Sequence, residues 1–327
     1  MKAFILAGGF GTRLRPLTLT RPKHLLPIAN RPHIEHVFDL LLKHGIDEAV
    51  LMTSYLAEAF ADTMAGAAQR GMSLEITNEV EPLGTAGALK NAEHLVGDEA
   101  FLAFNGDVLT DVDLAAVLDF HREREAEASI VLTPVEDPSA YGVVPTKDDG
   151  TVLGFIEKPP RGRTPTNLIN AGIYVLEPSV LDRIPPERVW SAERELFPRL
   201  VTEGARLFAT ATDAYWMDIG TPQKYVRANM DALSGGFSTD AVQDVGEDLV
   251  LSASSSEIAT DARVSSVCMG EDTRVASGAT ISGSVLLPGA RVDAGATVTG
   301  SVLGEGATVA AGAKVENVAV GDGEVVE

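Results

Sequence analysis

Near its start the chain reads Leu6-Ala-Gly-Gly-Phe-Gly-Thr-Arg-Leu-Arg-Pro-Leu-Thr18, and soon afterwards Arg21-Pro22-Lys23. A short apolar run before the glycines predicts a strand. Glycines directly after a strand let backbone N–H groups approach an anion closely, because no Cβ stands in the way. The first 34 residues hold six Lys or Arg and no acid, whereas the whole chain has 47 acids against 26 bases. This cationic, glycine-rich loop therefore predicts a site for a polyphosphate.

The loop differs from two common glycine-rich motifs that bind phosphate. The phosphate-binding loop of many NTPases needs a Lys-Ser or Lys-Thr pair after its glycines, and none follows here. The dinucleotide-binding motif G-x-G-x-x-G would need glycine at position 14, where this chain has Leu14.

Length and composition set limits on the kind of protein. The 327 residues are enough for two domains, and 45% hydrophobic with 22% charged residues is an ordinary globular composition. A single cysteine, Cys268, excludes an internal disulfide and favours a reducing compartment. A formal charge of −21 argues against binding to nucleic acid or to an anionic membrane. The first apolar run ends at Gly8, too early for a secretion signal or a membrane span, so we expect a cytoplasmic protein.

Strands and amphipathic helices alternate through residues 1–233. The strand-like runs are Lys2–Leu6, Ala49–Thr53, Ser73–Thr77, Ala100–Phe104 and Ser129–Pro134, followed by shorter ones at 142–146, 151–156 and 171–176. Helices are predicted around 34–42 and over 56–70, 86–96, 112–126 and 222–233. This order predicts an α/β domain with a Rossmann-like, mixed and mostly parallel sheet. Ligands of such sheets bind at the carboxyl ends of the strands, where the glycine loop would lie.

Residues 234–249 predict a linker, and a repeat of 17 residues follows within 250–327. Its units begin at Val264, Ile281, Val298 and Val315, and aliphatic residues recur inside each unit at steps of five or six. Three short strands per turn, each directing one aliphatic side chain inward, predict a triangular parallel β-helix. The repeat resembles the hexapeptide repeats of left-handed β-helix domains. We expect this domain to be structural and to join copies of the chain into a homo-oligomer.

Two aspartates from distant segments are candidate metal ligands. Asp107 follows the strand that ends at Phe104, and Asp218 precedes the predicted helix at 222. Mg²⁺ binds one or two carboxylates and fills its other positions with water and substrate phosphates. Two aspartates that converge beside a phosphate-binding loop would therefore hold Mg²⁺. Asp111 and Asp113 are interpreted as a turn residue and a helix N-cap.

The opening stretch resembles the signature of the sugar-1-phosphate nucleotidylyltransferases, G-G-x-G-T-R-L-x-P-L-T followed by P-K. The resemblance covers essentially the whole chain. It implies catalytic roles for Arg13, Lys23, Asp107 and Asp218. It assigns nucleotide binding to Leu6, Ala7, Gly8, Gly9, Gly11, Thr12, Arg13, Pro82, Gly84, Thr85 and Asn105. It assigns binding of the sugar phosphate to Gly142, Glu157, Lys158, Asn170 and Ala171.

One pair in this set conflicts with simple strand geometry. Glu157 and Lys158 are adjacent, and neighbouring residues of a strand point to opposite faces of the sheet. A strand end or a bulge is needed there if both side chains are to contact one substrate.

The loop Glu81-Pro-Leu-Gly-Thr-Ala-Gly-Ala-Leu89 resembles that of guanylyltransferases that act on mannose 1-phosphate. The implied reaction is GTP + mannose 1-phosphate → GDP-mannose + pyrophosphate. One alternative is a thymidylyl- or uridylyltransferase acting on glucose 1-phosphate. A second is a non-catalytic relative that binds nucleotide sugars, which would predict an eroded signature. A third is an acyltransferase activity in the β-helix, but all six histidines precede that domain.

Overall fold

The structure is a computed structural model that describes the whole chain except Tyr55 and Asp244; the latter falls in the predicted linker. It contains two compact units. The first comprises Met1–Gly9 and Val37–Trp216, and the second Phe10–His36 and Met217–Glu327. The predicted division into 1–233, 234–249 and 250–327 stays a prediction.

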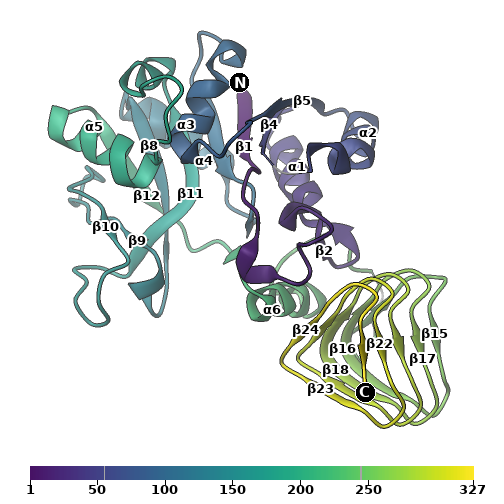
Figure 1. The fold of residues 1–327 in the computed structure, drawn as a ribbon. Helices are drawn as coiled ribbons and strands as arrows, with labels where there is room; N and C mark the ends of the chain where they lie inside the picture. The colour runs from purple at the N-terminus through teal and green to yellow at the C-terminus, as the bar shows by residue number, and fades with distance from the viewer. Residues whose placement is uncertain (55, 244) are drawn as a thin grey trace. The chain divides into compact units, whose positions relative to one another are not determined.

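The first unit is built on a mixed sheet, in which the strands run in the order β10-β9-β11-β6-β1-β4-β5, and β8 and β12 extend from β11 (Figure 1). Strand β1 pairs in parallel with β4 and β6, and β4 pairs in parallel with β5. Strand β11 is antiparallel to β6 and β8, while β12 is parallel to β8. The bounds are β1 (Lys2–Leu6), β4 (Glu48–Thr53), β5 (Ser73–Asn78), β6 (Phe101–Asn105), β8 (Ala128–Pro134), β9 (Gly142–Val143), β10 (Ile156–Glu157), β11 (Leu168–Leu176) and β12 (Leu207–Ala211). Strand β7 (Val108–Thr110) lies outside this sheet. The α/β fold with a mixed, mostly parallel sheet is confirmed.

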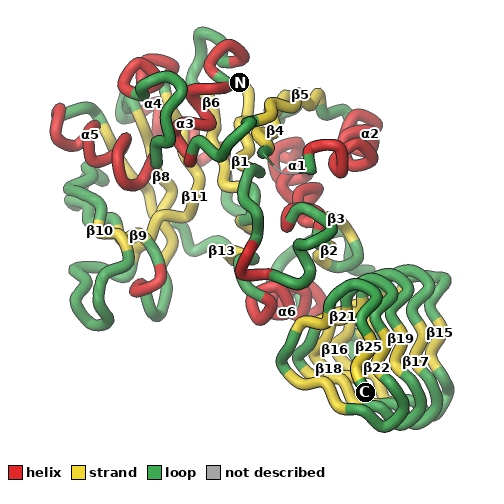
Figure 2. The backbone as a smooth tube through the Cα atoms, in the orientation of Figure 1, coloured by secondary structure: helices red, strands yellow, loops and turns green. Residues whose placement is uncertain are grey.

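Helices of this unit pack on the sheet; Figure 2 shows helices in red and strands in yellow. The helices are α1 (His33–Lys43), which belongs to this unit from Val37 onward, α2 (Ala61–Gln69), α3 (Gly84–Asn91), α4 (Leu114–Glu123) and α5 (Phe197–Glu203). Helix α3 packs on β1, α4 on β8 and β12, and α5 on β12. The core between them is aromatic and aliphatic: the rings of Phe4 and Phe101 meet edge to face at 5.1 Å, and those of Tyr174 and Phe197 lie 5.0 Å apart.

Several predicted elements differ from those observed. The strand expected over 151–156 is reduced to Ile156–Glu157, because Thr151 and Val152 make only isolated bridges to other segments. The helix expected over 56–70 divides into a 3-10 turn, Ala57–Phe60, and α2. The helix expected over 86–96 ends at Asn91 and is followed by a 3-10 turn, Glu93–Leu95. The π-helical turn Ala192–Leu196 that precedes α5 had no counterpart in the prediction.

The second unit combines the signature segment with the C-terminal repeats. Its first part has 3-10 turns at Thr12–Leu14 and Lys23–Leu25 and a small hairpin of β2 (Pro27–Ile28) and β3 (Arg31–Pro32). Strand β13 (Trp216–Asp218) begins at the last residue of the first unit, and α6 (Pro222–Leu233) follows with the predicted bounds. The Thr221 hydroxyl caps α6 by accepting the Lys224 N–H at 3.3 Å.

The repeats form a left-handed parallel β-helix in which each coil pairs with the next (Figure 1). The pairing aligns Val264 with Ile281, then with Val298 and Val315, which is the register that the 17-residue period predicts. The side chains at the recurring aliphatic positions of the repeat are buried from Met269 to Val320. The strands are β14 (Val250–Ser252), β15 (Glu257–Ile258), β16 (Arg263–Met269), β17 (Arg274–Val275), β18 (Thr280–Leu286), β19 (Arg291–Val292), β20 (Thr297–Thr299), β21 (Val302–Leu303), β22 (Thr308–Val309), β23 (Lys314–Glu316), β24 (Ala319–Val320) and β25 (Val325–Val326).

Candidate active site

Two predicted nucleotide-binding segments lie at the carboxyl ends of neighbouring strands in the first unit. Leu6 ends β1 and Asn105 ends β6, and the Gly106 N–H donates to the Leu6 carbonyl at 3.0 Å. The Ser54 hydroxyl donates to the carbonyl of Gly8. A Cβ added at Gly8 would lie 2.9 Å from that hydroxyl, so the segment needs glycine for close packing. Asp107 lies two residues beyond β6 and is half-buried.

The loop at residues 81–89, which its resemblance to the guanylyltransferase loop makes the candidate base-selecting loop, is held by the segment before α5. One backbone hydrogen bond joins Leu83 and Trp190, in which the Trp190 N–H donates to the Leu83 carbonyl at 2.7 Å. The Trp190 carbonyl accepts from the N–H groups of Ala86 and Gly87, both at 2.9 Å. A Cβ at Gly84 would lie 2.9 Å from the same carbonyl, and Gly84 has φ +75°. Close backbone packing therefore requires glycine at position 84, whatever the loop binds.

A chain of side chains runs from this loop to the predicted sugar contact. The Thr85 hydroxyl donates to Glu193 Oε2 at 2.9 Å. The Tyr174 hydroxyl donates to Glu193 Oε1 at 3.1 Å and accepts from Asn170 Nδ2 at 2.7 Å. Sequence reasoning missed Glu193 and Tyr174. Glu193 is linked to Thr85 across 108 residues of the chain, and the signature of the opening stretch contains neither residue.

An irregular register in β11 brings Asn170 and Tyr174 together. Pairing with β8 shifts between these two residues, at Gly172, which has φ +75°. The Gly172 N–H donates to Asn170 Oδ1 at 2.9 Å. A Cβ at Gly172 would lie 2.5 Å from Asn105 Nδ2, so glycine here lets Asn105, a predicted nucleotide contact, approach the backbone beside Asn170, a predicted sugar contact.

The conflict between Glu157 and Lys158 is resolved by the end of a strand. β10 ends at Glu157, and Lys158 has φ +45°, so the backbone leaves the extended conformation between them. The Lys158 ammonium then lies 3.8 Å from the Glu157 carboxylate. Glu157 pairs with Gly142, where a Cβ would lie 3.3 Å from its carboxylate. The predicted sugar-phosphate residues of this hairpin therefore lie together.

Trp216 is a further residue of this region that the sequence did not single out for a role. Its indole N–H donates to the carbonyl of Ala171 at 2.9 Å, and its ring meets Tyr141 edge to face at 5.6 Å. It thereby fixes the backbone beside Asn170.

In the second unit, the rest of the signature packs around Gly11. Gly11 has φ +61°, and a Cβ there would lie 3.0 Å from Thr18 Cγ2 and 3.2 Å from Lys23 Cβ. The Thr18 hydroxyl donates to the Gly11 carbonyl at 2.9 Å. The third signature glycine therefore allows Lys23 to approach the loop.

Arg13 and Asp218 both lie close to Gly220. A Cβ at Gly220 would be 2.8 Å from the Arg13 guanidinium and 3.2 Å from the Asp218 carboxylate. Asp218 also forms an ion pair with Lys224, one turn into α6. Lys224 was not predicted, although its place six residues after Asp218 at a helix start was visible in the sequence.

The predicted site residues are thus divided between the units. The first unit holds Leu6, Ala7, Gly8, Gly9, Pro82, Gly84, Thr85, Asn105, Asp107, Gly142, Glu157, Lys158, Asn170 and Ala171, and the second holds Gly11, Thr12, Arg13, Lys23 and Asp218. The convergence of Asp107 with Asp218 stays a prediction.

Residues 2–235 match the nucleotidyl transferase family. The chain belongs to this family. Residues 237–326 match the family of GlmU-like, C-terminal hexapeptide domains. The first match covers the α/β fold and the second covers the β-helix.

Similar proteins carry names that agree with this family. Mannose-1-phosphate guanylyltransferase of Mycobacterium tuberculosis is 41% identical over 250 residues, which are 76% of this chain and 69% of the relative. The mannose-1-phosphate guanylyltransferase catalytic subunit beta of Danio rerio is 43% identical over 230 residues, 69% of this chain and 63% of the relative. The match thus spans less than two thirds of the second relative.

Solved structures of similar fold include HddC from Yersinia pseudotuberculosis, with a TM-score of 0.62 and 29% identity over 70% of this chain and 97% of that one. A second structure of that protein, complexed with GMP-PN, has a TM-score of 0.61.

The donor chemistry of this nucleotidyl transferase fits a divalent metal, which the family generally uses. The Asp218 carboxylate is 16% exposed and already holds one cation, the Lys224 ammonium. Aspartate oxygens suit hard cations that complete their coordination with substrate phosphates. Among the described residues, no three His, Cys, Asp or Glu side chains form a metal cluster of their own. A metal here would therefore depend on one or two aspartates and on the substrate.

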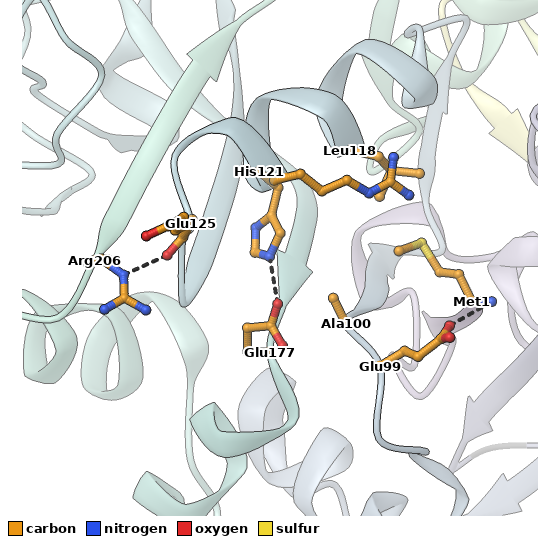
Figure 3. A pocket seen from close by; sticks show the side chains of 10 residues that line it. Met1, Glu99, Ala100, Leu118, His121, Glu125, Glu177 and Arg206 are labelled. Atoms are coloured by element: carbon orange, nitrogen blue, oxygen red, sulfur yellow. Dashed lines mark hydrogen bonds and ion pairs between the residues drawn. The ribbon is translucent and has the colours of Figure 1, made fainter.

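A separate cavity of about 620 Å³ lies at the opposite ends of the strands (Figure 3). Met1 and Ala100, just before β1 and β6, line it together with His121 of α4. The His121 ring contacts Ser129 Oγ at 2.9 Å and Glu177 Oε1 at 3.3 Å. Burial lowers the pKa of His121 and outweighs the opposite effect of Glu177. No predicted site residue lines this cavity.

Among the described residues, no helix combines the length and the apolar character that crossing a membrane requires.

Proposed function

We propose that this nucleotidyl transferase condenses GTP with mannose 1-phosphate to give GDP-mannose and pyrophosphate. The observation that carries the proposal is that relatives from bacteria, animals and plants, at 41–43% identity, are named mannose-1-phosphate guanylyltransferase. The loop that contains Pro82, Gly84 and Thr85 supports it. The small residues of this loop leave its backbone accessible to a flat base.

The proposed reaction is an in-line displacement at the α-phosphorus of GTP. A phosphate oxygen of mannose 1-phosphate forms the new P–O bond, the bond to the β-phosphate oxygen breaks, and pyrophosphate leaves with that electron pair. The attacking phosphate is already anionic, so no general base is needed. Positioning of the two anions and neutralisation of their charge are the work of the protein.

Each predicted site residue binds one part of the substrates or the metal in this scheme. Arg13 and the glycine-loop amides hold the triphosphate, and Lys23 lies on the side of the α-phosphate. Lys158 holds the sugar phosphate while Glu157, Asn170 and the backbone of Gly142 and Ala171 contact the sugar. Asp107 and Asp218 would hold Mg²⁺, which supplies charge neutralisation at the phosphates when bound.

A substrate panel tests the proposal. Pyrophosphate release is measured with GTP, ATP, dTTP and UTP, each combined with mannose 1-phosphate and glucose 1-phosphate. We expect GTP with mannose 1-phosphate to give the highest kcat/KM. A preference for dTTP or UTP with glucose 1-phosphate would assign the other transferase activity, and no turnover with any pair would favour a non-catalytic binding protein.

Two variants test the assigned residues. Arg13→Ala and Asp107→Asn should each lower kcat by about 10²–10³-fold, as removal of one group that stabilises the transition state does. Arg122→Ala and Asp119→Asn are matched controls, because these exposed residues pair with each other on α4. Near-normal turnover in Arg13→Ala and Asp107→Asn would contradict the assignment.

We also propose that copies associate through the β-helix. Strand β25, which pairs with β22, supports this because it carries an exposed Val325. Light scattering of the full chain tests it, and a monomer at all concentrations would contradict it.

A further inference from the structure

We infer that Glu193 is a positioning residue that couples the base-selecting loop to the sugar contact, so that binding at either place favours binding at the other. The inference rests on the proposed roles of Thr85 and Asn170. It assigns a function to a carboxylate that belongs to no motif of the signature.

The two oxygens of Glu193 hold two different parts of the site. Oε2 accepts from the Thr85 hydroxyl at 2.9 Å and from the Ser191 hydroxyl at 2.7 Å. Oε1 accepts from the Tyr174 hydroxyl at 3.1 Å. A planar carboxylate fixes the angle between these oxygens, so a movement of Thr85 that turns the group also moves the acceptor of Tyr174.

The direction of the hydrogen bonds at Tyr174 is fixed. Burial raises the pKa of Tyr174 well above its usual value, and Glu193 raises it further, so the phenol keeps its proton. That proton is donated to Glu193, which leaves the phenol oxygen to accept from Asn170 Nδ2 at 2.7 Å. Because the phenol is 1% exposed, water has little access to replace either partner.

Asn170 is oriented at both ends of its amide. Nδ2 donates to Tyr174, and Oδ1 accepts from the Gly172 N–H at 2.9 Å. One amide hydrogen and one lone pair remain for a sugar hydroxyl. A tilt of the Tyr174 hydroxyl would therefore turn the groups that face the sugar.

Thr85 is fixed in a similar way. Its hydroxyl donates to Glu193 and accepts from the Ala192 N–H at 2.7 Å. The path from Thr85 to Asn170 thus consists of three hydrogen bonds, with the charged group between the two proton donors. A base that orders the Thr85 loop would order Asn170 before the sugar phosphate arrives.

Calorimetry of the full chain tests the inference. The Kd of mannose 1-phosphate is measured with Mg²⁺, with and without a GTP analogue that has a methylene group between its α- and β-phosphates. We expect the analogue to tighten sugar-phosphate binding by a factor within about 5–150-fold, the usual range for coupled sites. By linkage, mannose 1-phosphate must tighten binding of the analogue by the same factor.

Variants along the path should abolish this factor. Tyr174→Phe removes the bridging oxygen with little change in volume, and Glu193→Gln replaces one acceptor by a donor. In both, we expect the coupling factor to fall to about one, while the Kd of the analogue alone changes less than about threefold. Thr85→Val should also lower the coupling factor to about one, and because Thr85 is a proposed nucleotide contact, its effect is read from the factor and not from the Kd of the analogue. Thr85→Ser keeps the hydroxyl and should retain the coupling.

Tyr225→Phe is the matched control. Tyr225 is equally buried, and its hydroxyl donates to the Pro27 carbonyl at 2.6 Å, away from this path. It should lower Tm as Tyr174→Phe does and leave the coupling factor unchanged. A coupling factor of one in the wild type, or an unchanged factor in Tyr174→Phe, overturns the inference. If the protein binds a different nucleotide or sugar phosphate, the proposed substrates are wrong, and the same cycle is measured with the pair that it binds.

Discussion

The guanidinium of Arg21 lies 2.8 Å from the carboxylate of Asp322, so the segment that leads to Lys23 is tied to the last coil of the β-helix. Arg21 also contacts Glu305 at 2.5 Å, and the Thr20 hydroxyl donates to Asp322 at 2.5 Å. The second oxygen of Asp322 accepts the Glu305 N–H at 2.8 Å. A β-helix coil and the signature segment therefore share one partly buried charge cluster.

Asp322→Asn should loosen the signature segment. Hydrogen bonds to charged groups contribute about 1.5–3 kcal/mol net, and the partial exposure of this cluster lowers that to about 1–2 kcal/mol. We expect opening of residues 12–25 to increase about 5–30-fold, measured by hydrogen exchange of peptides from that segment. Glu257→Gln is the control, because Glu257 pairs with Arg274 between two other coils at 3.5 Å and both side chains are exposed.

The effect should depend on pH with a defined sign. Burial alone would raise the pKa of Asp322, but hydrogen bonds from Thr20, the Glu305 N–H and Arg21 outweigh it and hold the pKa below its usual value. The contribution is therefore complete above the usual aspartate pKa of about 3.9 and is lost as pH falls through the lower folded-state pKa. If opening of residues 12–25 differs between wild type and Asp322→Asn as much below that pH range as it does at neutral pH, the assignment is contradicted.

Gly172→Ala should lower the free energy of unfolding by more than the left-handed backbone conformation alone explains. Alanine in this conformation costs about 1–2 kcal/mol. At Gly172 the added Cβ would also lie 2.5 Å from Asn105 Nδ2, so Asn105 must shift. We expect a loss of more than about 2 kcal/mol in urea unfolding together with a raised KM for the nucleotide.

Gly204→Ala separates the two causes. Gly204 has φ +71°, close to that of Gly172, but no atom lies within 4 Å of its added Cβ. It should lose only the conformational part, about 1–2 kcal/mol, with an unchanged KM. Equal losses in the two variants would show that crowding against Asn105 contributes nothing.

The repeat and the opening strand were predictable because each carries its own periodic signal. The 17-residue period gave the β-helix register directly, since an aliphatic side chain directed inward in one coil must lie on its equivalent in the next. The predicted strand Lys2–Leu6 has the same ends as the observed β1, because the glycines that follow it mark where the apolar run stops.

Elements defined by distant partners were not predictable. β12 is a five-residue strand that forms by pairing with β8, about eighty residues earlier in the chain. The roles of Glu193 and Tyr174 likewise depend on Thr85 and Asn170, which the sequence places far apart. The positive φ of Lys158 was not visible either, although the need for a strand end at that point was.

Glu79→Gln should stabilise the protein near neutral pH. Glu79 is 6% exposed and accepts the Leu83 N–H at 2.9 Å, at the start of the candidate base-selecting loop. Burial raises its pKa, and the hydrogen bond from Leu83 offsets this only in part. An amide oxygen can accept the same N–H without a buried charge, so we expect a gain of about 1 kcal/mol or less.

The gain should disappear in acid. Because the folded-state pKa of Glu79 is raised, wild-type stability from this group is present below the unfolded value and is lost as pH rises through the folded value. Tm of wild type and variant should therefore coincide below about pH 4.5 and separate towards pH 7. Glu81→Gln is the control, because Glu81 is exposed in the same loop, and it should leave Tm unchanged both below about pH 4.5 and near pH 7.

His121→Gln should flatten the acid side of the stability profile. Burial lowers the pKa of His121, with Glu177 acting in the opposite direction and Arg122 lowering it further. The unfolded chain therefore takes up a proton near the usual pKa of about 6.5 while the folded protein does not. Stability from this group is full above that pH and falls as pH drops towards the lower folded-state pKa, by at most about 1.4 kcal/mol per pH unit.

Thermal unfolding between about pH 7.5 and 5.5 measures this difference. Glutamine can hydrogen-bond to Ser129 and Glu177 but does not titrate, so Tm of the variant should fall less steeply than that of wild type. His94→Gln is the control, because His94 is exposed and its replacement should leave the slope unchanged. If His121→Gln and wild type lose stability in parallel over this range, His121 is not the group that takes up the proton on unfolding, and the acid sensitivity must come from another residue.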